Sequence, residues 1–341
     1  MTKHFVSAGR LRIWVLPTLG AAAAAVALLS IGIGRYGVHP SDVLATMWAH
    51  LEGGKHPDTA IDSVVFNLRL PRIVVAVLIG GTLAVAGACF QSLFSNPLAT
   101  PDTLGVSGGT SVGAVIALLL DWHLIGVQIL ALAAGLATMA ITITIARGRS
   151  GISVIMLVLA GVIVGALANA ILSILKLTAD PTSQLPEITY WLMGSLSGVK
   201  YEAIALAAPF IIGGTIVIVA MRWQLNILSL SEDEARAAGI NVRFQRGILI
   251  VAATVITASV VSMCGQVGWI GLLVPHVAKM LVGADNRHVI RVSLLLGAVA
   301  MVAIDTLSRS LTESEIPISI LTALIGAPFF ISLLRRSGVR G

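Results

Sequence analysis

Charged residues are scarce in this sequence, at 11% of 341 residues, and aromatic residues make up only 5%. A soluble domain of this length with so few charges would expose large apolar patches. The sequence also lacks the GxxxxGK[ST] pattern of a phosphate-binding loop. A soluble fold and a nucleotide site of that kind are therefore excluded.

Cysteine is almost absent, and the two that occur, Cys89 and Cys264, lie inside apolar runs with no CxxC spacing. We expect both to be small buried hydrophobic residues, with no role in a disulfide or a metal site. The net charge of +6 would suggest a nucleic-acid partner for a soluble protein. Here Lys and Arg gather in short loops between apolar runs, so no nucleic-acid partner is expected.

Apolar residues dominate instead, at 57% of the chain with a mean hydropathy of +0.96. A membrane-spanning helix needs about 20 apolar residues, so this content is enough for about ten spans. The sequence therefore predicts an all-α membrane protein with about ten transmembrane helices. Its apolar runs fall near residues 13–35, 72–93, 104–120, 125–146, 152–176, 203–221, 247–264, 268–282, 289–308 and 317–334.

An even number of spans places both termini on one side of the membrane. With the N-terminus in the cytoplasm, about two thirds of the 22 Lys and Arg lie in cytoplasmic loops, so the positive-inside rule predicts that both termini are cytoplasmic. The first run, after Lys3, Arg10 and Arg12, could be mistaken for a secretory signal. At about 22 residues it is too long for a signal peptide, so a retained first helix is predicted.

Three segments depart from simple spanning helices. The eighth run is short and contains Pro275, which predicts an interrupted helix packed against protein. The segment Asn96–Pro101 forces a turn, and Ile188–Leu196 is too short to span and is expected to form a short helix on the outer side. A faint inverted repeat of 72–176 with 246–335 is also indicated, because an arginine in each half precedes a run that reaches a cysteine.

The loop at 224–246 has the signature of a well-capped short helix. Ser231 and Glu234 form a capping box, and Gly239 suits the residue just after a helix. One interpretation is a rigid peg that docks into a groove on a cytoplasmic partner. The other is an ordinary solvated connector, and the residues alone do not separate the two.

Arg69, Arg72 and Arg309 lie at the outer side, against the positive-inside trend. They are interpreted as a basic collar that pairs with carboxylates of an extracytoplasmic partner, with interfacial snorkelling as the alternative. Asp305 lies within the ninth run and is a candidate functional carboxylate. A structural hydrogen bond, for example to Thr306 or Ser308, is favoured because no second membrane carboxylate or lysine suggests a proton relay.

Gly105–Gly109 matches the GxSxG motif of intramembrane serine proteases of the rhomboid type. Such an enzyme would use Ser107 as nucleophile and needs a histidine base, for which His276 is the candidate. A close-packing or turn role for the glycines is the simpler interpretation.

Several strings together resemble the FecCD-like permease family of type II ABC importers, which carry iron siderophores, haem and cobalamin. The resemblance covers nearly the whole chain. It is carried by Arg69-Leu-Pro-Arg72, Asn96-Pro-Leu-Ala99, Ala235-Arg236 with Gly239, Gly268-Trp-Ile-Gly-Leu-Leu-Val-Pro-His276, and Glu315-Ile-Pro317 with Gly326-Ala-Pro328.

The resemblance implies a multi-pass permease of the bacterial plasma (inner) membrane that works as a homodimer, with the fifth run (152–176) lining a path between the copies. Its partners would be two cytoplasmic ABC ATPase subunits and one substrate-binding protein. The permease itself would bind no cofactor and would not be an enzyme, since ATP and Mg would sit on the ATPase.

The resemblance also assigns residues to roles. ATPase coupling falls to the segment with Ser231, Glu234, Ala235, Arg236, Gly239 and Asn241. Binding-protein docking falls to Arg69, Arg72 and Arg309, and the cytoplasmic gate to Asn96 and Leu98, with a second ring near Ser153.

Iron chelates, siderophore or haem, are the expected substrate, with cobalamin or molybdate as alternatives in the same architecture. The competing classes are an intramembrane protease and an ion-coupled secondary transporter. The latter should show paired ionisable groups at mid-membrane, where this sequence offers only Asp305.

Overall fold

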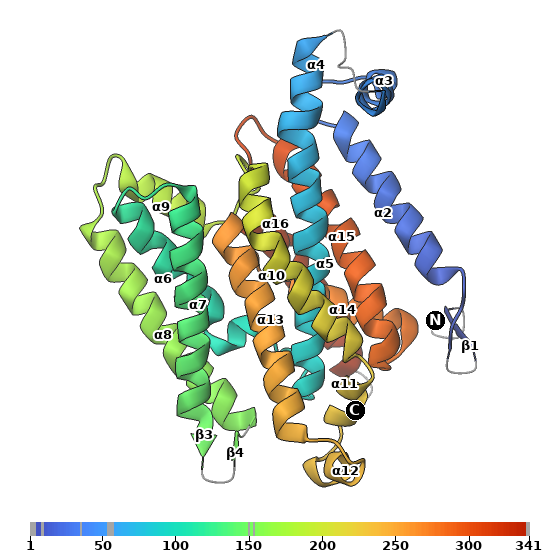
Figure 1. The fold of residues 1–341 in the computed structure, drawn as a ribbon, viewed down its shortest axis with the longest axis vertical. Coiled ribbons are helices and arrows are strands. Elements are labelled where there is room, and N and C mark those ends of the chain that lie inside the picture. The colour runs from blue at the N-terminus through green and yellow to red at the C-terminus, as the bar shows by residue number, and fades with distance from the viewer. Residues whose placement is uncertain are drawn as a thin grey trace.

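The computed structural model describes residues 5–7, 10–34, 36–52, 58–148, 151–152 and 154–338. These residues form a helical bundle with two small hairpins at one end (Figure 1). The hairpins pair β1 (Val6–Ser7) with β2 (Arg10–Leu11) and β3 (Arg147–Gly148) with β4 (Gly151–Ile152), both antiparallel.

Each of the ten apolar runs contains a helix. Seven of the described helices are long and apolar enough to span a membrane, and three are shorter apolar helices. The ten are α2 (Val15–Gly32), α5 (Leu70–Leu93), α6 (Val106–Leu119), α7 (Leu124–Ala146), α8 (Val154–Thr178), α10 (Tyr201–Ala220), α13 (Val242–Cys264), α14 (Ile270–Val282), α15 (Asn286–Ser310) and α16 (Ile318–Gly338).

The remaining helical segments are short. They are α3 (Pro40–Leu51), α4 (Thr59–Ser63), the π-helix η1 (Val64–Arg69), the 3-10 helix η2 (Pro101–Leu104), α9 (Gln184–Leu192), α11 (Gln224–Leu228) and α12 (Glu232–Ala237).

The second span begins earlier than its apolar run. The segments α4, η1 and α5 form one continuous helix of 35 residues, Thr59–Leu93, so Arg69 and Arg72 lie inside a helix. The π turn ends just before Pro71, which has no backbone N–H for a regular helical bond. Such π turns are rare and often mark functional sites.

Two short helices that the sequence predicts, one in the eighth apolar run and one near residues 188–196, are present in the structure. Helix α14 has 13 residues with Pro275 inside it, as expected for the eighth run. The short helix expected at 188–196 is α9, which lies four residues earlier. The chain turns after α9 at Gly194, whose φ of 73° is in the left-handed region.

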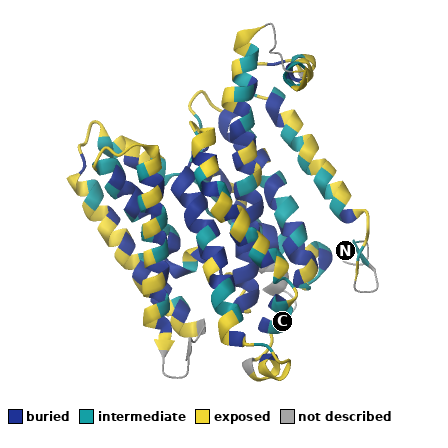
Figure 2. Ribbon diagram, in the orientation of Figure 1, coloured by how far each residue is buried: buried dark blue, intermediate teal, exposed yellow. Residues whose placement is uncertain are grey.

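The core of the bundle is formed by α5, α13 and α15 (Figure 2). Within their most apolar windows, 83% of residues are buried in Thr59–Leu93 and 78% in α13, against 17% in the peripheral α2. Glycines allow the close crossing of α5 and α15, because a Cβ on Gly80 would lie 2.1 Å from the carbonyl oxygen of Gly297. Small residues allow helices to approach in this way inside membranes. Cys89 and Cys264 are free and buried in this core, as predicted.

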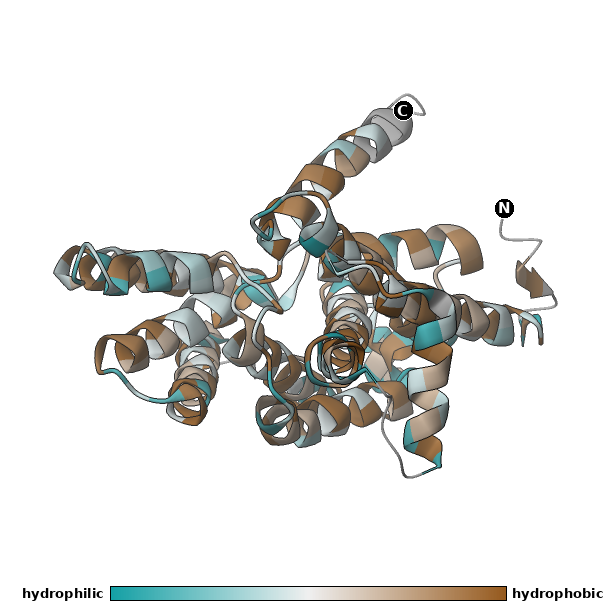
Figure 3. Ribbon diagram, turned by 90° about the horizontal axis from the view of Figure 1, so that it is seen from above, coloured by the Kyte–Doolittle hydropathy of each residue, from teal (hydrophilic) through white to brown (hydrophobic). Residues whose placement is uncertain are grey.

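The bundle has two opposite ends (Figure 1). We call one the α12 end, where α12, the β3–β4 hairpin and the start of α2 lie. We call the opposite one the α9 end, where α3, α4 and α9 lie. Viewed from above, α16 projects from the bundle with its C-terminal end pointing outward (Figure 3).

Candidate functional site

The segment 224–246 lies at the α12 end and contains α11, α12 and the start of α13 (Figure 1). Ser231 accepts a hydrogen bond from the Glu234 backbone N–H, and Glu234 accepts one from the Ser231 N–H at 3.0 Å, so the predicted capping box is confirmed. The hydrogen bonds from the Ser231 side chain and backbone lower the pKa of Glu234. Gly239 follows the helix with φ 78°, and nothing lies within 4 Å of the place where a Cβ would be.

The other predicted residues of this segment differ in their surroundings: one is buried, one is exposed and one caps a helix. Ala235 is completely buried and fixes α12 to the bundle, whereas Arg236 is exposed. The Asn241 side chain accepts a hydrogen bond from the Phe244 N–H at 3.1 Å, so it caps the N-terminus of α13. Side-chain caps therefore define the start of α12 and the start of α13, and Ala235 packs α12 against the bundle while Arg236 stays exposed.

The predicted gate loop lies between α5 and η2. The Asn96 side chain accepts a hydrogen bond from the Leu98 N–H at 2.9 Å, which stabilises the turn, and Leu98 is 50% exposed. Ser95 donates to the Ser229 carbonyl at 3.2 Å, so this loop contacts the linker between α11 and α12. Ser153, the third gate prediction, lies outside the described residues.

A polar network that the sequence reasoning missed connects α11 to the two core helices α5 and α15. The Asn226 amide donates to Asp285 at 2.7 Å and accepts from the Asn286 N–H at 2.8 Å. Ser92, on α5, donates to the Asn286 side chain at 2.7 Å. The only sequence signal was Asp285 as a helix cap before the ninth run.

Asp285 is ionised within this network. Partial burial raises its pKa, but hydrogen bonds from Arg287 and Asn226 outweigh that effect and lower it to about 2. The carboxylate therefore stays charged at neutral pH and continues to accept from both donors. It links α11 to α15 by a charge-assisted hydrogen bond.

At the α9 end, Arg72 forms the centre of a buried ion cluster. Its Nε donates to Asp305 at 2.7 Å and its Nη1 to Glu315 at 2.8 Å. Asp305 is fully buried and also lies 3.6 Å from the Nε of Arg309. The favoured structural role of Asp305 is supported, but its partner is an arginine of α5 rather than Thr306 or Ser308.

Arg69 and Arg309 tie α2 to the same cluster. Arg69 donates to the carbonyls of Ile31 and Gly32, the latter at 3.2 Å. Arg309 donates to the Ser30 hydroxyl at 2.7 Å and the Ile33 carbonyl at 2.6 Å. These carbonyls are at the last turn of α2, where helix backbones lack internal partners.

The three collar arginines are therefore not solvent-facing groups. Arg69, Arg72 and Arg309 are only 6%, 8% and 7% exposed, and each has partners within the chain. Sequence reasoning missed Glu315 as one of these partners. Docking of a binding protein by these arginines remains a prediction.

The protease dyad does not form. Ser107 donates its hydrogen bond to Asp102, five residues earlier in the same turn region. His276 on α14 packs edge-on against Phe330, with ring centroids 6.4 Å apart. The serine thus has a carboxylate partner and no histidine among its hydrogen bonds in the described part of the chain.

Comparisons with known proteins identify the family. The model of the FecCD transport family matches residues 22–336. The chain belongs to the FecCD transport family. A FecCD chain is a transport subunit of an ABC importer rather than an enzyme, and this one is a multi-pass membrane permease.

Relatives of this FecCD chain differ in their named substrates. The molybdate import permease MolB of Haemophilus influenzae is 36% identical over 317 residues, covering 92% of this chain and 94% of MolB. The hemin permease HmuU of Yersinia pestis is 36% identical over 281 residues, covering 79% of this chain and 82% of HmuU. A solved ABC transporter assigned to the metal-chelate type, in an inward-facing conformation, matches with a TM-score of 0.85 and 34% identity, covering 95% of this chain and 99% of that one.

Proposed function

We propose that this FecCD permease carries iron chelates, either siderophore complexes or haem, through a path between two copies of the chain. The observation that carries the substrate proposal is the face of α8. No charged residue occurs from Val154 to Leu175, and Leu159, Val162 and Leu167 are 52%, 62% and 61% exposed.

An uncharged path favours a chelate over a bare anion. Moving an unpaired ion next to apolar side chains costs several kcal/mol, whereas an organic shell shields the charge of the metal. Weak contacts along such a path also favour release of the substrate from it. The chemistry of α8 therefore fits an iron chelate better than free molybdate, while cobalamin shares the large organic shell.

Exposed apolar surface supports the homodimer. Helix α16 projects from the bundle (Figure 3), and its Leu324 and Ile331 are 66% and 52% exposed. A second copy covering α8 and α16 would enclose the path that one chain leaves open. In this proposal the α12 end is cytoplasmic and meets two ATPase subunits, which bind ATP and Mg.

Coupling to the ATPase is proposed for α12 and the residues around it. The buried Ala235 packs α12 against the bundle, so a push on the exposed face of α12 would be passed on to the bundle. Two contacts would carry that movement inward: Ser95 with Ser229 at the gate loop, and Asn226 with Asp285 at the start of α15.

Transport experiments test the proposal directly. The tagged chain is purified with the proteins that accompany it, reconstituted in liposomes and supplied with ferric siderophore, haem, cobalamin or molybdate. We expect an ATPase to co-purify and iron chelates to accumulate only with hydrolysable ATP. Accumulation of molybdate or cobalamin alone would contradict the proposed substrate. Absence of any co-purified ATPase would contradict the proposal of ATP-driven import.

Docking of a binding protein at the α9 end is proposed from the charge of the ion cluster. Arg69, Arg72 and Arg309 carry three positive charges against two negative charges on Asp305 and Glu315. The excess positive charge would attract an acidic surface.

Salt dependence checks this docking without altering the buried cluster. Affinity of the wild-type permease for its binding protein is expected to fall about ten-fold or more between 50 mM and 500 mM NaCl, because salt screens the long-range attraction between the net charge of the cluster and an acidic surface. Affinity that does not change with salt would contradict docking through the collar.

A further inference from the structure

A small pocket of about 210 Å³ opens at the α9 end, between α9 and the loop that leads to α10 (Figure 1). One wall is a face of α9 that carries Glu187, Tyr190 and Trp191, at the spacing that places side chains on one side of a helix. The loop contributes Ser195 and Ser197, and apolar residues of α7, α10 and α13 line the remainder. We call this the α9 pocket. It combines one carboxylate, two aromatic rings and two hydroxyl groups.

Glu187 is the one charged residue of the α9 pocket. It is exposed, and its side chain has no hydrogen bond or ion pair within the described part of the chain. Two other carboxylates at this end do have partners, since Asp305 pairs with Arg72 at 2.7 Å. Asp180 accepts from the Thr182 hydroxyl at 2.7 Å. The first turn of α9 suits an acidic residue through the helix dipole, but the dipole does not account for the aromatic wall beside it.

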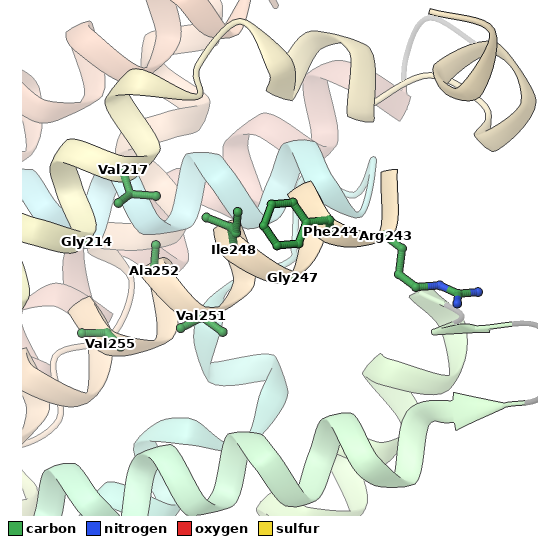
Figure 4. A pocket seen from close by; sticks show the side chains of 9 residues that line it. All are labelled: Gly214, Val217, Arg243, Phe244, Gly247, Ile248, Val251, Ala252 and Val255. Carbon is green, nitrogen blue, oxygen red and sulfur yellow. The ribbon is translucent and has the colours of Figure 1, made fainter. Parts of the chain in front are cut away.

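A larger groove, of about 550 Å³ between α10 and α13, has no comparable group (Figure 4). Its lining is apolar or glycine except for Arg243, and this arginine already interacts with another group of the chain. In Figure 4 its guanidinium points away from the apolar floor. That groove therefore selects no particular ligand, unlike the α9 pocket.

The lining of the α9 pocket selects a cation on an apolar stem. A carboxylate forms charge-assisted hydrogen bonds with ammonium and guanidinium groups, and the faces of Tyr190 and Trp191 attract the same groups. Apolar lining such as Val199 and Met263 can cover methylene groups. The volume is below the range of about 300–1,000 Å³ that is typical of small-molecule sites. The pocket is therefore suited to one lysine or arginine side chain rather than to a whole chelate.

We propose that the α9 pocket receives a lysine or arginine side chain of the substrate-binding protein. This inference rests on the docking at the α9 end proposed above, and adds to it a second contact of opposite charge. The ion cluster has an excess of positive charge, whereas Glu187 is an isolated negative charge at the same end. A docking face with both signs favours one orientation of the partner, because a rotated complex would bring like charges together.

The affinity of the permease complex for its binding protein tests this inference. The permease with its ATPase is placed in lipid nanodiscs, and the probe is the substrate-binding protein encoded beside the permease, immobilised on a sensor. Glu187→Gln removes the charge, and Tyr190→Leu removes an aromatic face. Glu202→Gln is the matched control, because Glu202 is also an exposed glutamate in the first turn of a helix, α10, but does not line the pocket.

Each variant has its own expected result at 50 mM NaCl. Glu187→Gln should weaken binding about ten-fold, because the basic side chain loses its counter-charge. Tyr190→Leu should weaken binding about two- to five-fold, the usual size of a cation–π contact at an exposed site. Glu202→Gln should stay within about two-fold of wild type, as expected for an exposed charge outside the contact. At 500 mM NaCl the difference between wild type and Glu187→Gln should shrink, because salt screens the pair.

Two results would overturn the role of the α9 pocket while leaving docking through the ion cluster in place. One is equal affinity of Glu187→Gln and Glu202→Gln. The other is lower uptake by Glu187→Gln at unchanged affinity, which would assign the pocket to the substrate. Absence of any binding to the wild-type complex would instead overturn docking itself, and this inference with it. Glutamine and glutamate have similar helix propensities, so both glutamate variants are expected to fold.

Discussion

Replacing Asp305 by asparagine is expected to lower the free energy of unfolding by about 3–5 kcal/mol, the usual cost of removing one partner of a buried ion pair. Asp305 is fully buried and accepts from Arg72 at 2.7 Å. Without its charge, Arg72 keeps only Glu315, and Arg309 loses its nearest carboxylate. The apparent melting temperature in detergent should fall by on the order of 5–10 °C.

A double variant separates the ion pair from simple packing. In Arg72→Met with Asp305→Leu both charges of that contact are removed, but Glu315 loses Arg72 and Arg309 loses Asp305, so only part of the lost stability should return. The exposed pair of Arg287 with Asp285 supplies the control, since the Arg287 side chain is 46% exposed and Arg287→Gln should cost at most about 1 kcal/mol. If Asp305→Asn were no more harmful than Arg287→Gln, the cluster would not be a stabilising centre.

The cluster also shows where sequence reasoning stops. From the sequence alone, an arginine at the end of an apolar run that faces water cannot be distinguished from one that pairs with a carboxylate on another helix. Arg72 and Asp305 are 233 residues apart in sequence, and only the crossing of α5 with α15 brings them together. Glu315 was visible in the sequence as part of a family motif, but its partner was not.

Local features, by contrast, were predictable. Long apolar runs have no alternative to helices in a membrane, so all ten were found. The capping box at Ser231 and the left-handed turn at Gly239 depend only on near neighbours in sequence, and both are present. The start of the second span at Thr59 was missed, because the part of this helix that lies at the α9 end is less apolar than the rest.

Replacing Gly239 by tryptophan is expected to abolish ATP-driven uptake, by at least about 100-fold, while leaving the chain folded. The position after α12 is open, with nothing within 4 Å of a Cβ, so a bulky side chain can start there without a clash and would obstruct a docked partner. A non-glycine residue at φ 78° costs about 1–2 kcal/mol, which is small against the loss expected from a blocked interface. Uptake and ATP hydrolysis are measured on the same reconstituted complex.

Two controls distinguish blocked docking from backbone strain. Gly239→Ala has the same strain without the bulk, and it should keep most of the uptake. Gly198→Trp has matching strain at φ 73° and equally open space, but it lies between α9 and α10 at the opposite end. It should leave co-purification with the ATPase unchanged, whereas Gly239→Trp should reduce it or uncouple hydrolysis from uptake. Full uptake in Gly239→Trp would mean that α12 is only a connector, because a groove that holds this helix closely has no room for an indole beside it.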